Sequence, residues 1–420
     1  MIAAVVFLIV IALIGAPLFT VIAAGALLAS HSADISPDII IIEMHRLAAS
    51  PNMIAIPLFT FAGVLMSSGG APHRLVNFYR AAFGWMPGGL AIVTIGACAF
   101  FTTFSGASGV TILALGGLLY PILRGEGYEK NFSLGLLTTS GSLGLLFPPS
   151  LAILVYGIVA GVSIENMFFA GLVPGALLMI MLAIYSMIHG RKINVVKHKF
   201  KLNTLLTATI GSIWDLFLPV GIVTGIFGGF VSIMEAAAVT AAYVILVEVY
   251  IYKEINLRTQ FFGLLVETCV LFGSLLAILL VALGLTNLMI DAQLPMKLLG
   301  AIEDHISSPL QFLLLLNLFL LLVGAMMDIF SAIIVVVPLI LPLAARYGID
   351  PIHLGVIFLA NLEIGYSTPP VGINLFIASQ RFGKPIITLF RSTLPYLLIM
   401  LIWLLMITYM PELSLWWKPD

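Results

Sequence analysis

Long apolar runs separated by short polar breaks form the main pattern of this chain. Runs such as FLLLLNLFLLLVGAMM are apolar on every face, whereas the strands of a membrane β-barrel alternate apolar and polar residues over about 10 positions. A spanning helix needs about 20 apolar residues. The pattern therefore predicts an all-α protein with about ten to twelve membrane spans, broken at residues 30–52, 69–87, 124–131, 189–204, 253–260, 291–308, 346–353 and 381–392.

The composition agrees with an integral membrane protein. The chain of 420 residues is 61% hydrophobic and 9% charged with a net charge of -1, against about 25% charged residues in soluble domains. This charge excludes a basic surface for nucleic acid. Cys98 and Cys269 both lie in apolar runs and indicate neither a disulfide framework nor a cysteine metal site. The segment Met1–Ala29 lacks the basic start of a signal peptide, so we expect it to be the first span.

Basic residues predict which breaks face the cytoplasm. The break HGRKINVVKHKFK is the most basic of them and is expected to be cytoplasmic. Counting spans outward from it gives two groups. Lys253, Arg258, Arg381, Lys384 and Arg391 fall on the cytoplasmic side, and Asp291, Glu303 and Asp304 on the external side.

The chain also matches itself at an offset of 221 residues. Glycine and proline coincide without a gap at five pairs of positions: Pro121 and Pro342, Gly127 and Gly348, Gly144 and Gly365, Pro148 and Pro369, and Pro149 and Pro370. The predicted charges place the two copies in opposite orientations across the membrane. Inverted repeats with interrupted helices are typical of alternating-access transporters.

Each repeat is predicted to contain a re-entrant helical hairpin followed by a helix broken at a double proline. The hairpins are expected at 89–123 and 309–343, and the broken helices at 132–162 and 354–380. We expect five units along the chain: scaffold helices at 1–88, the first transport repeat at 89–166, scaffold or arm helices at 167–308, the second transport repeat at 309–391 and a C-terminal helix at 392–420.

Non-helical backbone at membrane depth is tolerated only where protein buries it or a wet cavity adjoins it. Its free carbonyls, with nearby hydroxyls, suit a hard monovalent cation. The alternative is that the glycine, serine and threonine residues of the breaks only let helices pack closely.

Asp328 is a candidate substrate contact, or a helix N-cap, or both. Glu235 and Glu267 are expected to pair between helices, and His353 to be a solvated loop histidine.

Several strings together resemble the large membrane subunit of tripartite ATP-independent periplasmic (TRAP) transporters. They are SGASG, GSLGLLFPPS, MMDIFSAIIVVVPLILP, GIDPIHLGV and NLEIGYSTPPVGINLF. The resemblance extends over nearly the whole chain. It implies a sodium-driven, elevator-type secondary transporter of the bacterial inner membrane with two or more sodium ions and no organic cofactor. It also implies a soluble periplasmic binding protein that delivers an organic acid, such as sialic acid, a C4-dicarboxylate or a sugar acid, and a small four-helix membrane subunit, for which this chain has no room.

The resemblance also assigns residues by position. Ser105, Ser108 and Asp328 correspond to substrate-binding positions at the hairpin tips. The first sodium site corresponds to Ser105, Ser108, Gly144, Phe147 and Pro149, and the second to Gly324, Met327, Gly365, Thr368 and Val371. The chain departs from the family at Ala107, where many members have serine, and this leaves the substrate open.

Three other functions make different demands on the sequence. A channel would be expected to show charged rings or a symmetric pore. An enzyme would need a nucleophile and a base, or metal ligands, that converge, and the chain shows neither pattern. A stand-alone sodium/dicarboxylate or citrate carrier of similar hairpin architecture remains the alternative.

Overall fold

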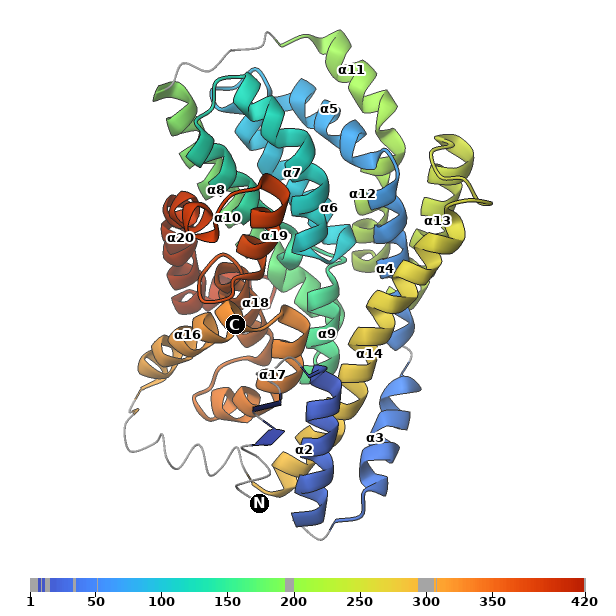
Figure 1. The fold of residues 1–420 in the computed structure, drawn as a ribbon, viewed down its shortest axis with the longest axis vertical. Coiled ribbons are helices and arrows are strands. Elements are labelled where there is room, and N and C mark those ends of the chain that lie inside the picture. Colours follow the sequence, from blue (N-terminus) through green and yellow to red (C-terminus); the bar gives the residue numbers. More distant parts are fainter. Residues whose placement is uncertain are drawn as a thin grey trace.

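The computed structural model describes residues 16–32, 35–50, 52–192, 200–293 and 308–418, together with residues 7, 8, 10, 11 and 306. These residues form helices and contain no strand, which confirms the predicted all-α class (Figure 1). Lys197, Lys199, Glu303 and Asp304, which entered the topology prediction, lie outside the described residues, as do residues 1–6, 9 and 12–15 of the expected first span.

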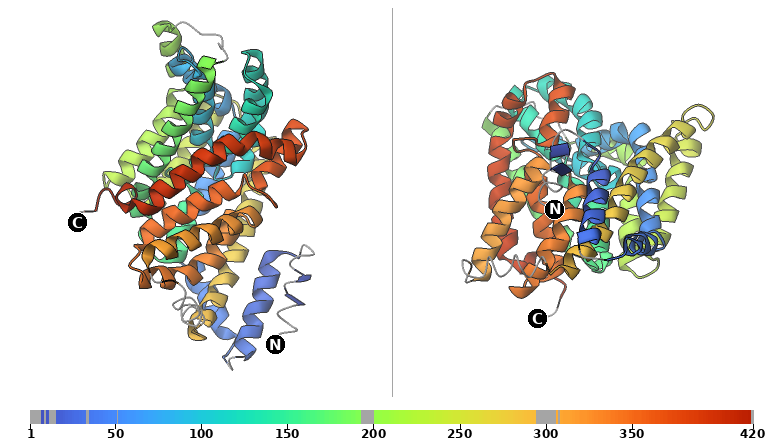
Figure 2. Two further views of the ribbon diagram at one scale, coloured as in Figure 1. Left: turned by 90° about the vertical axis from the view of Figure 1, so that its left-hand side faces the viewer. Right: turned by 60° about the horizontal axis from the view of Figure 1, so that its bottom comes forward.

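Helices α4, α12, α13 and α14 lie together on one side of the molecule, beside the predicted repeats (Figures 1 and 2). Helix α4 packs along α13, and α14 packs against α2, α3 and α4. The α10 helix follows the first repeat and α20 follows the second. The elements outside the predicted repeats are α2 (Leu18–Ser32), α3 (Asp38–Ala48), α4 (Asn52–Ser68), α5 (Ala71–Phe83), α10 (Ile164–Lys192), α11 (Leu202–Gly211), α12 (Ile213–Phe227), α13 (Ile233–Ile245), η2 (Leu246–Ile251), α14 (Phe261–Asp291), α20 (Ile386–Tyr409) and η3 (Pro411–Leu413).

The two predicted repeats have the same order of four α-helices, and the first also contains a short 3-10 helix, η1. The first runs through α6 (Gly89–Ser105), α7 (Ser108–Gly125), α8 (Lys130–Ser140), η1 (Leu143–Leu146) and α9 (Leu151–Ala160). The second runs through α16 (Pro309–Met326), α17 (Ile329–Arg346), α18 (Pro351–Gly365) and α19 (Ile373–Phe382). The helices extend two or three residues beyond most of the predicted limits. The expected boundaries at 167 and 392 fall inside α10 and α20, because both helices begin before their first long apolar stretch.

Seven helices of the described part of the chain are long and apolar enough to cross a membrane, or up to ten if each bent pair is one span. The upper number meets the lower end of the predicted ten to twelve. One bent pair is the first broken helix, where α8 with η1 turns by 46° into α9. The residues between them include Pro148 and Pro149, which lack the N–H that a continuous helix needs.

A buried ionic cluster, which we call the arginine cluster, ties the start of α5 to α12, to η2 and to the loop that follows η2. Arg74 Nε lies 2.6 Å from Asp215 Oδ2, its Nη2 lies 2.7 Å from Glu248 Oε1, and it also pairs with Glu254. Burial lowers the pKa of Arg74, but the hydrogen bond to Asp215 and the nearby carboxylates outweigh burial and raise it. The guanidinium is therefore a fixed positive charge, and removing it would leave buried carboxylates unpaired at a cost of roughly 3–5 kcal/mol.

Candidate transport site

The first hairpin turns between α6 and α7 because Gly106 adopts a φ of 65°, which favours glycine at a helix C-terminus. The Gly106 N–H donates to the Thr102 carbonyl at 2.9 Å. Beside the turn, Ser105 Oγ lies 3.5 Å from Thr111 Oγ1 and 3.4 Å from the Ala107 carbonyl. Thr102 Oγ1 lies 2.7 Å from Thr111 Oγ1. The tip therefore gathers hydroxyl and carbonyl oxygens around one turn of backbone.

The first double-proline break lies directly against this hairpin. A Cβ atom on Gly144 would be 2.3 Å from both the Thr103 nitrogen and the Ala99 oxygen, so only glycine allows this approach. The Gly144 carbonyl accepts hydrogen bonds from the Phe147 N–H at 3.1 Å and from Thr103 Oγ1 at 3.3 Å. Pro149 is buried just beyond. Gly144 thus brings the predicted carbonyl ligands to the base of the hairpin tip.

At the second hairpin, Asp328 caps α17. Its carboxylate accepts from the Ser331 N–H at 3.0 Å and from the Ser331 hydroxyl. The N–H of the next residue, Ile329, donates to the Tyr366 hydroxyl at 2.5 Å. Asp328 therefore has the capping role that the sequence allowed, and it lies half-buried at the tip, where its role toward a substrate stays a prediction.

The second double-proline break contacts its hairpin in the same way. A Cβ atom on Gly365 would lie 2.4 Å from the Gly324 carbonyl carbon. The Val371 N–H donates to the Ala325 carbonyl at 3.1 Å, and the Thr368 N–H donates to the Gly365 carbonyl at 2.9 Å. The second set of predicted ligands therefore also gathers where a hairpin meets a break.

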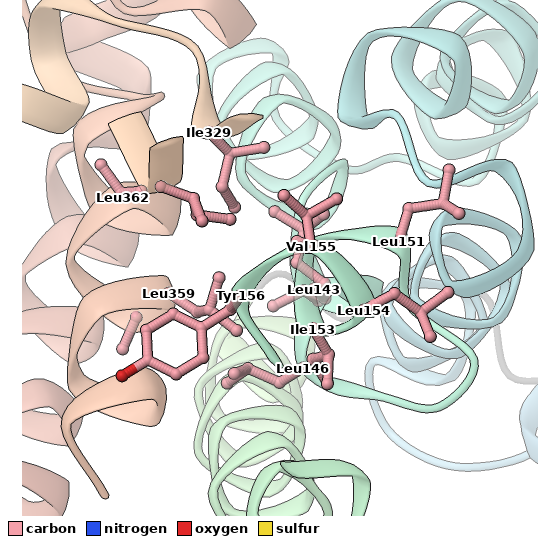
Figure 3. Packing of buried hydrophobic residues seen from close by; sticks show 14 of the residues in the cluster. Leu143, Leu146, Leu151, Ile153, Leu154, Val155, Tyr156, Ile329, Leu359 and Leu362 are labelled. Carbon is pink, nitrogen blue, oxygen red and sulfur yellow. The ribbon is translucent and has the colours of Figure 1, made fainter. Parts of the chain in front are cut away.

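The contacts of the two repeats correspond at the offset found in the sequence. Adding 221 to Thr103 and Gly144 gives Gly324 and Gly365, the pair in contact in the second repeat. The helices also pack reciprocally, with α7 on α19 and α17 on α9. Figure 3 shows apolar side chains from the second of these contacts, including Val155 of α9 beside Ile329 of α17.

Buried polar groups without partners lie beside the second break. Glu363 is 0% exposed, and neither carboxylate oxygen has a hydrogen-bond partner among the described residues. The same holds for Ser367 Oγ and Asn374 Oδ1. Asn374 Nδ2 reaches across to the Thr138 carbonyl at 3.4 Å and so joins the two repeats. The hydroxyls of Ser140 and Ser150 beside the first break are unpartnered too within the described part of the chain. Buried polar groups rarely stay unsatisfied, so both breaks are candidates for bound ions or substrate, and only the second has a buried carboxylate in the part that the structure describes.

The predicted site residues thus form two sets. Where α6, α7 and η1 meet, the structure places Ser105, Ser108, Gly144, Phe147 and Pro149; where α16, α17 and the end of α18 meet, it places Gly324, Met327, Asp328, Gly365, Thr368 and Val371. Their roles as ligands stay predictions. Sequence reasoning missed Thr102, Thr111, Tyr366 and Asn374. The polar letters TTFS inside an apolar run and the tyrosine beside Gly365 were available signals.

Comparison with known proteins supplies the family. The sequence model of the tripartite ATP-independent periplasmic transporter, DctM component, matches residues 2–413. The C4-dicarboxylate TRAP transporter large permease protein DctM of Pseudomonas aeruginosa is 35% identical over 385 residues, which cover 90% of each chain. The sialic acid TRAP transporter permease protein SiaT of Haemophilus influenzae is 30% identical over 362 residues, which cover 86% of this chain and 59% of SiaT.

The fold also has a solved counterpart. The YdaH transporter of Alcanivorax borkumensis, whose structure was described as having an unusual topology, matches with a TM-score of 0.60 at 15% identity. The match covers 90% of this chain and 88% of YdaH, and at this identity it speaks for the fold alone. The family match over almost the whole chain and the 35% identical relative lead to one conclusion: the chain belongs to the DctM component family of tripartite ATP-independent periplasmic transporters, as a multi-pass permease of the inner membrane.

Proposed function

We propose that this permease imports an organic acid by sodium-driven secondary transport. The observation that carries the proposal is the repeated meeting of a hairpin tip with a double-proline break, through Gly144 in one repeat and Gly365 in the other. Each meeting point brings carbonyl and hydroxyl oxygens together, which suits sodium. Two sodium sites follow, one at Ser105, Ser108 and the 144–149 break, and the other at Gly324, Met327 and the 365–371 break.

The proposed substrate is an organic acid of the kind named for the relatives. The P. aeruginosa and Vibrio cholerae proteins, each 35% identical, are named for C4-dicarboxylates. Other relatives are named for isethionate, ectoine and sialic acid. We assign Asp328 and Ser105 to the polar groups of the substrate and the sodium ions to its carboxylate, because a bare carboxylate would repel an anion.

Two partners belong to the proposal. A soluble periplasmic binding protein delivers the substrate, and a small four-helix membrane subunit completes the permease. The alignment with the isethionate permease DctMQ of Oleidesulfovibrio alaskensis covers 95% of this chain and 62% of DctMQ. Movement follows the elevator scheme, in which the two repeats carry the substrate past the helices that flank them.

Reconstitution tests this proposal. Proteoliposomes that contain the permease and the small subunit receive the binding protein, a labelled C4-dicarboxylate or sialic acid, and either a sodium or a potassium gradient. We expect uptake only with inward sodium and with the binding protein present. Equal uptake in potassium would remove the sodium coupling. Full uptake without the binding protein would move the function to a stand-alone carrier.

A further inference from the structure

A groove of about 760 Å³ lies between α5 and α11, away from the candidate transport site. Both helices meet at the same end of the molecule (Figure 1). The described residues that line the groove include no aspartate or glutamate. They do include hydrogen-bond donors and positive charges, namely Asn77, Arg80, Lys201, Thr204 and Thr207. This lining suits an anion.

The same groove has an apolar rim. The Trp85 and Phe200 rings contact each other edge to face, with centroids 6.1 Å apart, and are 47% and 51% exposed. Helix α11 turns by 70° from the apolar α12 and has no buried residue. Its apolar side chains Leu206 and Ile210 are exposed. A helix of this kind lies in the membrane interface, and tryptophan favours the same depth.

The positive charges differ in how far they are already neutralised. Arg74 reaches the groove but belongs to the arginine cluster and is bound by carboxylates. Arg80 pairs with Glu126 at 2.9 Å, yet 41% of its side chain is exposed. Lys201 is exposed and forms no ion pair with the described residues. Lys201 is therefore the principal free cation of the groove.

We propose that this groove binds the headgroup of an anionic phospholipid. Its phosphate would sit between Lys201 and Arg80, with the Thr204 hydroxyl as a further donor, while the acyl chains follow the exposed apolar side of α11. The combination of a basic, donor-lined groove with an apolar rim favours a lipid over a soluble anion, because a soluble phosphate gains nothing from Trp85, Phe200 or Leu206. The bound lipid would brace α5, which leads into the first hairpin, against α11.

Lipid binding can be measured directly on the purified permease. Native mass spectrometry counts bound phosphatidylglycerol and phosphatidylcholine, and thermal unfolding is followed in nanodiscs of each lipid. We expect selective retention of phosphatidylglycerol and a higher unfolding temperature with it. Lys201→Gln should lower the apparent affinity about fivefold, since a basic residue near an anionic membrane contributes about that factor. Lys201→Arg should restore it.

A matched control is Arg391→Gln, an exposed cation on α20, which packs on α8, α10, α18 and α19; it should leave phosphatidylglycerol binding unchanged. The proposal would be overturned if the double variant Lys201→Gln, Arg80→Gln bound phosphatidylglycerol with the same affinity as the wild type. Equal retention of the two lipids would overturn it as well. If inorganic phosphate raised the unfolding temperature as much as phosphatidylglycerol does, the groove would be a site for soluble anions instead.

Discussion

The two double-proline breaks share their sequence register and differ in their surroundings. Pro148 and Pro149 are buried, whereas Pro369 and Pro370 are exposed. One residue further on, Ser150 is 0% exposed and its counterpart at the 221 offset, Val371, is 38% exposed. The backbone contacts to the hairpins are alike, so the difference arises from what covers each break on its other side.

Helix α10 provides the cover of the first break. A Cβ atom on Gly171 would lie 2.0 Å from the Leu146 oxygen, and one on Gly175 would lie 2.8 Å from the Phe147 ring. The positions 221 residues after these glycines are Ser392 and Tyr396 of α20, and they pack against α8 instead. The two equivalent breaks thus differ within one structure: α10 covers the first, and the second is exposed. The proposed alternating-access mechanism predicts an asymmetry of this kind, with the roles of the two breaks exchanged in the other state.

Cysteine labelling gives the largest expected contrast between the breaks. In a Cys269→Ser background, which removes the exposed native thiol and keeps the buried Cys98, Val371→Cys should react with a hydrophilic maleimide on the order of tenfold or more faster than Ser150→Cys, because access controls thiol reactivity. Phe230→Cys, at an 82% exposed position, sets the upper rate. Equal rates at 150 and 371 would remove the asymmetry.

The hairpin tips should differ in how strongly a substitution affects transport. Asp328→Asn keeps an oxygen for the Ser331 N–H, so we expect nearly unchanged thermal stability and loss of most uptake in the reconstituted system. Ser105→Ala should weaken uptake less. Asp38→Asn, at the start of α3, serves as the control for a carboxylate at a helix start. A well-folded Asp328→Asn variant with wild-type uptake would leave Asp328 only its capping role.

Glycine substitutions test the close contacts on each break. Gly365→Ala forces the second break away from Gly324, and Gly171→Ala forces α10 away from Leu146. Each should cost about 1–3 kcal/mol in the free energy of unfolding, as overpacking does, and Gly171→Ala should also speed labelling of Ser150→Cys. Gly263→Ala in α14 meets nothing within 4 Å and should stabilise slightly. If the Gly171→Ala protein had unchanged stability and unchanged labelling, α10 would not be the helix that covers the first break.

The offset of 221 residues explains how much the sequence could predict. Glycine and proline restrict the backbone, so their shared register predicted the two double-proline breaks, while polar residues inside long apolar stretches predicted the hairpins. Exposure depends on which helix packs on a break, and no local pattern separated Ser150 from Val371. His353, expected to be solvated, is buried and bonds to Ser414 Oγ at 2.6 Å, because the C-terminal segment folds back onto α18. Glu235 caps its own helix through Ser232 instead of pairing between helices.

The smallest expected effect concerns the starts of the two broken helices. Glu129 and Asp350 are equivalent at the 221 offset, but only Asp350 caps its helix, through the Ile352 N–H at 2.7 Å. Asp350 Oδ2 also lies 2.6 Å from Lys418 Nζ. Burial raises the pKa of Asp350, and the bonds from Lys418 and Ile352 outweigh burial and lower it below its usual value.

A carboxylate with a lowered folded pKa stabilises the protein above its unfolded pKa, near 4, and this contribution is lost as the pH falls through the folded pKa. Asp350→Asn keeps the cap and removes the ion pair. We therefore expect a loss of less than about 1 kcal/mol at neutral pH, typical of a partly exposed pair, and a difference from wild type that shrinks below pH 4. Thermal unfolding of Asp350→Asn, Lys418→Gln and the double variant measures the coupling. Additive losses at neutral pH would mean that the Lys418 contact contributes nothing to stability, and that the cap made by Asp350 is the difference that remains between the starts of the two broken helices.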